Sequence, residues 1–105
     1  MKLKKLRRIG NSLCFTVPSE YAEDMLRRGE ALYATIIGSS IAYSHDPLGP
    51  SIKVKLRPLA KHGDKVYYAL TVPSKLAAKL GLDSNAQVEV EYNGEKLILR
   101  KANNR

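Results

Sequence analysis

The chain has 105 residues, of which 44% are hydrophobic and 27% charged, and it carries a formal net charge of +8. A domain much below about 60 residues buries too little surface to be stable, so this length allows one compact unit or two small ones that share a core. No apolar run approaches the roughly 18 residues of a membrane span, and the amino end alternates Leu with cations, so we expect neither a span nor a signal peptide. The single cysteine excludes an internal disulfide, and we therefore expect a cytoplasmic protein without membrane contact.

Cations and leucines alternate at the start of the chain, where five cations and no acid lie within the first eight residues. Residues 2–8 therefore predict a half-buried strand with a basic face. Gly10, Asn11 and Ser12 predict a turn, because Gly and Asn tolerate positive φ and Ser bonds to nearby backbone. Residues 13–17 predict a second strand, in which we expect Cys14 to be a small buried hydrophobic residue.

A helix and a hairpin follow. Pro18 lacks the N–H that a strand needs and suits the first turn of a helix, which we expect to reach Arg28. The apolar positions on one face of this helix are Tyr21, Ala22, Met25 and Leu26. Gly29 is expected to end it in the left-handed conformation. Residues 30–37 and 41–44 are rich in β-branched and aromatic residues and predict a hairpin.

The second half of the chain repeats this order after a Pro- and Gly-rich linker at residues 46–50. The expected elements are a basic strand at 52–59, a turn at 62–65, a strand at 66–72 and a helix at 73–80. Asn85 is expected to take positive φ in place of Gly29. Asn93 and Gly94 predict a type I′ turn before a last strand at residues 95–101.

An internal repeat explains this recurrence. Residues 16–19 and 71–74 both read TVPS, and the apolar positions after them match at an offset of 55 and then 56. We therefore divide the chain into a first repeat at 1–45, a linker at 46–50, a second repeat at 51–101 and a tail at 102–105. Neither repeat alone has enough apolar residues to close a core, so we expect both to form one unit.

The order of strand, Gly-Asn-Ser turn, Val-Pro strand, short helix and hairpin resembles the SpoVT/AbrB and MazE-like family. The segment RRIGNSLCFTVPSEYAEDMLRRGEALYATI is similar to the MazE pattern, and TVPSKLAAKLGL is similar to the AbrB side of the family. In that family two copies interleave their hairpins into one swapped-hairpin β-barrel. The resemblance implies a mainly β fold with short helices, in which one chain supplies both halves of the barrel.

The family binds duplex DNA through a basic β face, so the resemblance implies a transcriptional regulator that binds double-stranded DNA. Arginine can pair with guanine or clamp a phosphate, Asn can pair with adenine, and Ser can hold a phosphate. Gly-Asp-Lys replaces Gly-Asn-Ser in the second repeat, which predicts phosphate contacts there instead of base reading. The predicted DNA-binding residues are Lys4, Lys5, Arg7, Arg8, Asn11, Ser12, Lys55, Arg57, Lys61 and Lys65.

Other functions stay open at this point. The first repeat also suits a MazE-like antitoxin with a toxin partner, although the chain ends in RKANNR without the acidic tail of such antitoxins. The same fold could serve as a protein-interaction module without DNA, and a homodimer or higher oligomer is possible. His45 and His62 have no second ligand at metal spacing, and no catalytic motif stands out. We therefore expect no enzyme activity, no metal and no cofactor.

Overall fold

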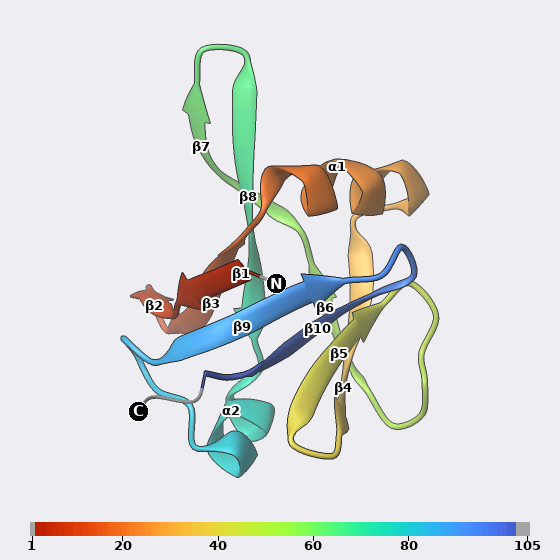
Figure 1. Cartoon of the computed structure of the whole chain (residues 1–105), viewed down its shortest axis with the longest axis vertical. Coiled ribbons are helices and arrows are strands. Elements are labelled where there is room, and N and C mark those ends of the chain that lie inside the picture. Colours follow the sequence, from red (N-terminus) through yellow and green to blue (C-terminus); the bar gives the residue numbers. More distant parts are fainter. Residues whose placement is uncertain (1, 103–105) are drawn as a thin grey trace.

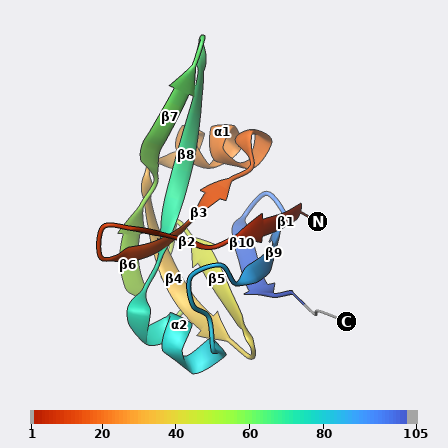
Figure 2. The ribbon, with the colours of Figure 1, turned by 90° about the vertical axis from the view of Figure 1, so that its left-hand side faces the viewer.

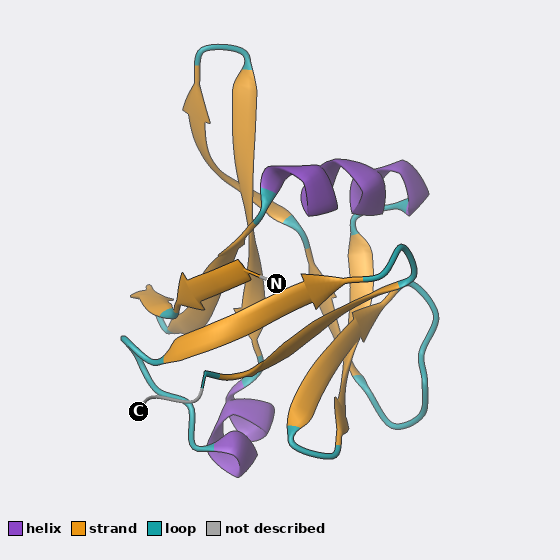
Figure 3. Cartoon of the chain, in the orientation of Figure 1, coloured by secondary structure: helices purple, strands orange, loops and turns teal. Residues whose placement is uncertain are grey.

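The described part of the chain is mainly β with two short helices, as the sequence predicts, and its strands form two β-sheets (Figures 1 and 3). The computed structural model describes residues 2–102. The elements are β1 (Lys2–Lys5), β2 (Arg7–Ile9), β3 (Ser12–Val17), α1 (Ser19–Arg28), β4 (Ala31–Ile37), β5 (Ser40–Ser44), β6 (Ile52–Lys55), β7 (Arg57–His62), β8 (Lys65–Val72), α2 (Ser74–Leu80), β9 (Gln87–Tyr92) and β10 (Lys96–Lys101).

Each sheet contains strands from both halves of the chain. The six-stranded sheet has the order β1-β9-β10-β5-β4-β6, and the four-stranded sheet has the order β2-β3-β8-β7. Each strand of the first half has a counterpart in the second, from β1 with β6 to β5 with β10. When every strand is exchanged for its counterpart, each sheet keeps the same strand order, read from the other end. The central pairs, β10 with β5 and β3 with β8, join the two halves.

The strand registers follow the same two-fold relation. Phe15 lies opposite Leu70 in the middle of the four-stranded sheet. On either side of this pair, Leu13 lies opposite Val72, and Val17 lies opposite Tyr68. In the six-stranded sheet the matching central pair is Ala42 and Ile98. An approximate two-fold axis therefore passes through the centres of both sheets.

The basic strands expected at residues 2–8 and 52–59 are each split in two, which corrects the prediction of single strands. Leu6 separates β1 from β2, and Leu56 separates β6 from β7. Both leucines are buried, at 0% and 2% exposure. At each of them the chain leaves the six-stranded sheet and enters the four-stranded one. Turning the leucine into the core between the sheets breaks the strand.

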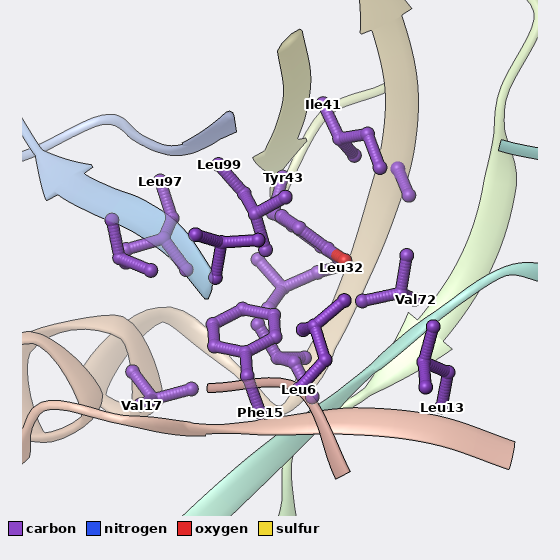
Figure 4. Close-up of a cluster of buried hydrophobic side chains, with 14 of the residues drawn as sticks. Leu6, Leu13, Phe15, Val17, Leu32, Ile41, Tyr43, Val72, Leu97 and Leu99 are labelled. Carbon is purple, nitrogen blue, oxygen red and sulfur yellow. The ribbon is translucent and has the colours of Figure 1, made fainter. Parts of the chain in front are cut away.

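The hydrophobic core lies between the two sheets, and Figure 4 shows side chains from both converging there. The Phe15 and Tyr43 rings lie 5.8 Å apart between centroids. The Tyr43 hydroxyl donates a hydrogen bond to the carbonyl oxygen of Thr71 at 3.0 Å, which satisfies its polar end inside the core. The helices lie at opposite ends of the molecule (Figure 1). Their buried residues are Ala22 and Met25 in α1, and Leu76 and Ala77 in α2.

Two of the three predicted turn conformations are wrong. Gly29 ends α1 with φ 131 and ψ 160, outside the left-handed helical region. A ring N–H of His45 donates to the carbonyl oxygens of Met25 at 2.9 Å and Gly29 at 3.1 Å, so the helix end is capped by a side chain. Asn85 has positive φ, at 74°, as predicted.

The turn at Asn93 and Gly94 is not type I′, because that turn needs positive φ at both residues. Gly94 has positive φ, whereas Asn85 is the one non-glycine residue with positive φ in the described part of the chain. The Asn93 side-chain oxygen instead accepts hydrogen bonds from the backbone N–H groups of Glu95 and Lys96, both at 2.9 Å. This side-chain bonding closes the turn without a strained Asn.

Candidate nucleic-acid interface

The predicted DNA-binding residues do not share one surface. Lys4, Lys5 and Lys55 belong to β1 and β6, at the two edges of the six-stranded sheet. The residues on the four-stranded sheet and its turns are Arg7, Arg8, Asn11, Ser12, Arg57, Lys61 and Lys65. The expected single basic face of residues 2–8 is therefore wrong.

The alternation along β1 is the reverse of the expected one. Side chains alternate between faces, so burying Leu6 places Lys4 on the core side of the strand. Lys4 is half-buried opposite the buried Val88, whereas Leu3 lies opposite Glu89 and is 63% exposed. An inward-pointing charge on an edge strand discourages pairing with another sheet edge. Lys4 is therefore a structural residue of the sheet edge.

Lys5 and Lys55 also belong to the six-stranded sheet, at the ends of its two edge strands. Lys5 is exposed opposite Gln87 on β9. Lys55 forms an ion pair with Glu30, with 3.0 Å between Nζ and Oε1. Both lysines precede the crossings at Leu6 and Leu56, so they belong to a different sheet from Arg7 and Arg57.

Arg7 and Arg57 lie at equivalent positions on the outer face of the four-stranded sheet. Arg7 on β2 is opposite Cys14, and Arg57 on β7 is opposite Ala69. Cross-strand partners share a face of the sheet, and the neighbouring residue of β3, Phe15, points into the core. Both guanidinium groups therefore belong to the face that points away from the core.

Small side chains fill the space between the two arginines on this outer face. The cross-strand pairs that lie between them are Cys14 with Thr71 and Thr16 with Ala69. Three strand spacings of about 4.8 Å and a shift of two residues place the Cα atoms of Arg7 and Arg57 roughly 16 Å apart. This separation is somewhat wider than the DNA major groove, which measures about 12 Å. Within the described residues neither arginine forms an ion pair with an acid.

Arg8 points to the opposite side of the sheet from Arg7. It lies opposite Leu13, on the core side, at the end of the sheet beside α2. A groove of about 280 Å³ forms there, which we call the α2 groove; its lining includes Arg8, Asn11, Ser12, Ser74 and Ala77. The four residues of the predicted reading motif are thus divided, with Arg7 on the outer face and Arg8, Asn11 and Ser12 in the α2 groove.

The hairpin of β7 and β8 is longer than that of β2 and β3. Residues 57–72 number 16, against 11 for the equivalent residues 7–17. The extra residues form a bulge between Pro58 and Ala60 and two further pairs, Lys61 with Val66 and His62 with Lys65. The hairpin therefore projects beyond the body of the protein, as Figures 1 and 2 show, and we call this projection the arm.

Tyr67 and His62 extend the outer face onto the arm, and the predicted site did not include them. The edge of one ring faces the other, with centroids 5.5 Å apart, and the Lys65 Nζ lies 5.7 Å from the Tyr67 centroid. A shallow hollow is lined by Arg7, Thr16, Leu59, Ala60, His62 and Tyr67. Tyr68 packs against the core, so the adjacent Tyr67 and Tyr68 face opposite sides of β8. Alternation along β8 places Lys65 and Tyr67 on the same face, and this pattern in the sequence could have identified Tyr67 as part of the site.

Three further features concern metal ions, membranes and the free cysteine. Within residues 2–102 there is no group of three or more His, Cys, Asp or Glu side chains that could hold a metal ion. Neither helix is long and apolar enough to cross a membrane in the part of the chain that is described. Cys14 is buried, with its sulfur 4.0 Å from the Thr71 hydroxyl oxygen.

Comparison with known proteins finds no match to a family model, to a curated protein or to a solved structure. Function is therefore inferred from the geometry and chemistry of the outer face.

Proposed function

We propose that the chain is a cytoplasmic DNA-binding protein, most simply a transcriptional regulator, that docks the outer face of its four-stranded sheet on duplex DNA. The observation that carries this proposal is the placement of Arg7 and Arg57 on either side of a platform of small residues. The cross-strand pairs between the two arginines contain no acidic side chain. The net charge of +8 adds a long-range attraction for a polyanion.

The mechanism follows from the size of these side chains. Cys14 and Ala69 are small and buried at the centre of the face, whereas the longer Arg7 and Arg57 side chains are exposed and can reach a duplex. Arginine can clamp a phosphate or pair bidentately with a guanine, and a β-ribbon fits the major groove. Lys61 and Lys65 add cations on the arm. Attraction to phosphates would supply most of the affinity.

The strand pairing supports the swapped-hairpin barrel that accompanies this function in AbrB-like and MazE-like proteins. In the proposed barrel each half donates its β-hairpin to the other. β1 pairs with β9 of the second half, and β6 pairs with β4 of the first. This exchange explains why one chain would carry two copies of the motif.

A gel-shift titration of duplex DNA at several salt concentrations tests the proposal. Each phosphate contact contributes about 0.9 to the slope of log affinity against log salt, so Arg7→Ala with Arg57→Ala should reduce its magnitude by about 2. The matched control, Lys5→Ala with Lys53→Ala, removes the same charge from the six-stranded sheet and should leave the slope almost unchanged. Duplex that is not retarded even at low salt would contradict DNA binding. An equal loss in both double variants would contradict the assigned face.

A further inference from the structure

The two ends of the four-stranded sheet are related by the approximate two-fold axis but differ in their side chains and in the length of their hairpins. One end carries the turn between β2 and β3 beside α2, and the other carries the arm beside α1. Two-fold symmetric proteins bind two-fold symmetric DNA sites, so equal ends would fit a palindrome. The differences between the ends, in the helix grooves behind the outer face and at the hairpin tips beyond it, therefore determine the symmetry of the DNA site.

The first difference is the residue beside each helix groove. Arg8 lies opposite Leu13 and lines the α2 groove. The equivalent position at the other end is Pro58, opposite Tyr68. Proline has no charge and no backbone N–H, so it cannot replace the donors of a guanidinium group. The α1 end thus lacks a counterpart of Arg8.

The second difference is charge. The lining of the groove beside α1 includes Glu23, Asp64 and Lys65, two acids and one cation, whereas Arg8 is the charged residue of the α2 groove. Glu20, which forms an ion pair with Lys2 at 3.5 Å, adds a further acid near Lys65. A hydrogen bond from its own backbone N–H is the main cause that lowers the pKa of the Glu20 carboxyl, and the charges of Lys2 and Lys65 lower it further. Negative charge therefore partly offsets Lys65 at the α1 end but does not offset Arg8.

The third difference is reach. The β2 and β3 hairpin closes directly after the pair of Ile9 with Ser12, so the Asn11 side chain stays close to the sheet. The arm continues past the equivalent pair, Ala60 with Tyr67, and carries Lys61 one residue beyond it. An Asn amide can pair bidentately with an adenine edge, whereas a Lys ammonium is a point charge that suits a phosphate. One end is equipped for base edges and the other for the backbone.

From these three differences we infer that the chain binds a non-palindromic duplex site in one fixed orientation. The β2 and β3 turn reads base edges at one end of the site, and the arm holds backbone phosphates beyond the other end. This inference rests on the proposed DNA-binding function and specifies the class of site. A single chain gains this ability because its two halves can differ, which two identical subunits cannot do.

Selection of duplexes from a random library with the full-length protein tests the inference. The expected result is an enriched motif without inverted symmetry, with its conserved bases at one end. An enriched inverted repeat would overturn the inference, as would retarded duplex without any enriched motif, and both results leave DNA binding intact. If no duplex is retained at low salt, the proposed function itself fails.

A tethered cleavage experiment on a selected duplex tests the orientation. Asp64→Cys in a Cys14→Ser background places a unique thiol at the tip of the arm for an iron chelate that cleaves nearby DNA. Cleavage is expected at the end of the site opposite the conserved bases. The Cys14→Ser protein, which has no thiol and is treated with the same reagent, provides the background control. Equal cleavage at both ends would show that the protein binds in both orientations and would overturn the inference.

Discussion

The backbone N–H of Leu6 donates a hydrogen bond to the carbonyl oxygen of Ala86 at 2.9 Å. The N–H of Leu56 makes the equivalent bond to Glu30, at 2.8 Å, in the opposite direction between the halves. Each half of the chain therefore holds the point at which the other half crosses between the sheets. Because Arg7 and Arg57 directly follow these crossings, the bonds between the halves also fix where the two arginines enter the four-stranded sheet.

Separation of the halves should unfold both. A cut between Gly49 and Pro50 leaves β1 without β9 and β6 without β4, so each fragment exposes the core that the other covers. We expect neither fragment to show a cooperative unfolding transition by circular dichroism, and an equimolar mixture to regain the β-sheet spectrum. Cooperative unfolding of one isolated fragment would contradict this.

Truncation of a crossing leucine should be costly. Leu6→Ala and Leu56→Ala each remove a fully buried side chain, and such changes destabilise by about 2–5 kcal/mol. Leu3→Ala is the matched control, because Leu3 is 63% exposed and its loss should change stability by about 0.5 kcal/mol or less. Urea denaturation followed by circular dichroism measures all three. Similar losses at Leu3 and Leu6 would contradict the assigned inversion of β1.

The left-handed residue Asn85 should tolerate glycine but not alanine. Its φ is 74°, and its N–H donates to the carbonyl oxygen of Leu6 at 2.9 Å. A Cβ without a polar group costs about 1–2 kcal/mol in this conformation, so Asn85→Ala should lower the free energy of unfolding by about that amount. Asn85→Gly relieves the strain and should stay close to the wild type. An equal loss of stability in both variants would contradict this, because it would show that the Asn85 side chain, and not its backbone conformation, stabilises the fold.

Alkaline pH should destabilise the protein through Tyr43. Burial raises the pKa of its hydroxyl in the folded state, whereas an unfolded Tyr ionises near pH 10. The raised folded-state pKa means that the stabilisation is fully present below about pH 10 and is lost as the pH rises above it.

Urea midpoints between pH 9 and pH 11 measure this effect. The urea midpoint of Tyr43→Phe should be lower than that of the wild type at pH 9, because the hydrogen bond to Thr71 is lost. This midpoint should also fall less steeply as the pH rises. Tyr92, whose pKa is raised by burial and by a hydrogen bond to Asp24, contributes in both proteins. Parallel pH profiles would show that Tyr43 does not contribute.

Local signals in the sequence were enough to predict both helices and the mainly β class. Pro18 and Pro73 stop a strand and open a helix by covalent restriction, whatever the rest of the chain does. The hairpin at residues 31–44 follows from β-branched residues on either side of a Gly-containing turn. These outcomes depend on residues within a few positions of each other.

The tertiary structure decided on which face of the sheet each arginine lies. Alternation along residues 2–8 is compatible with either orientation of the strand, and the burial of Leu6 between the sheets selects one of them. That selection places Lys4 inward and separates Arg7 from Arg8, although both cations look equivalent in the sequence.

The sequence by itself thus determined the elements and the basic character of the protein. The tertiary structure decided which cations share a surface, because Arg7 and Arg57 come together only through the pairing of β3 with β8. Composition reports how much charge a chain carries, whereas strand register across distant segments determines where that charge points.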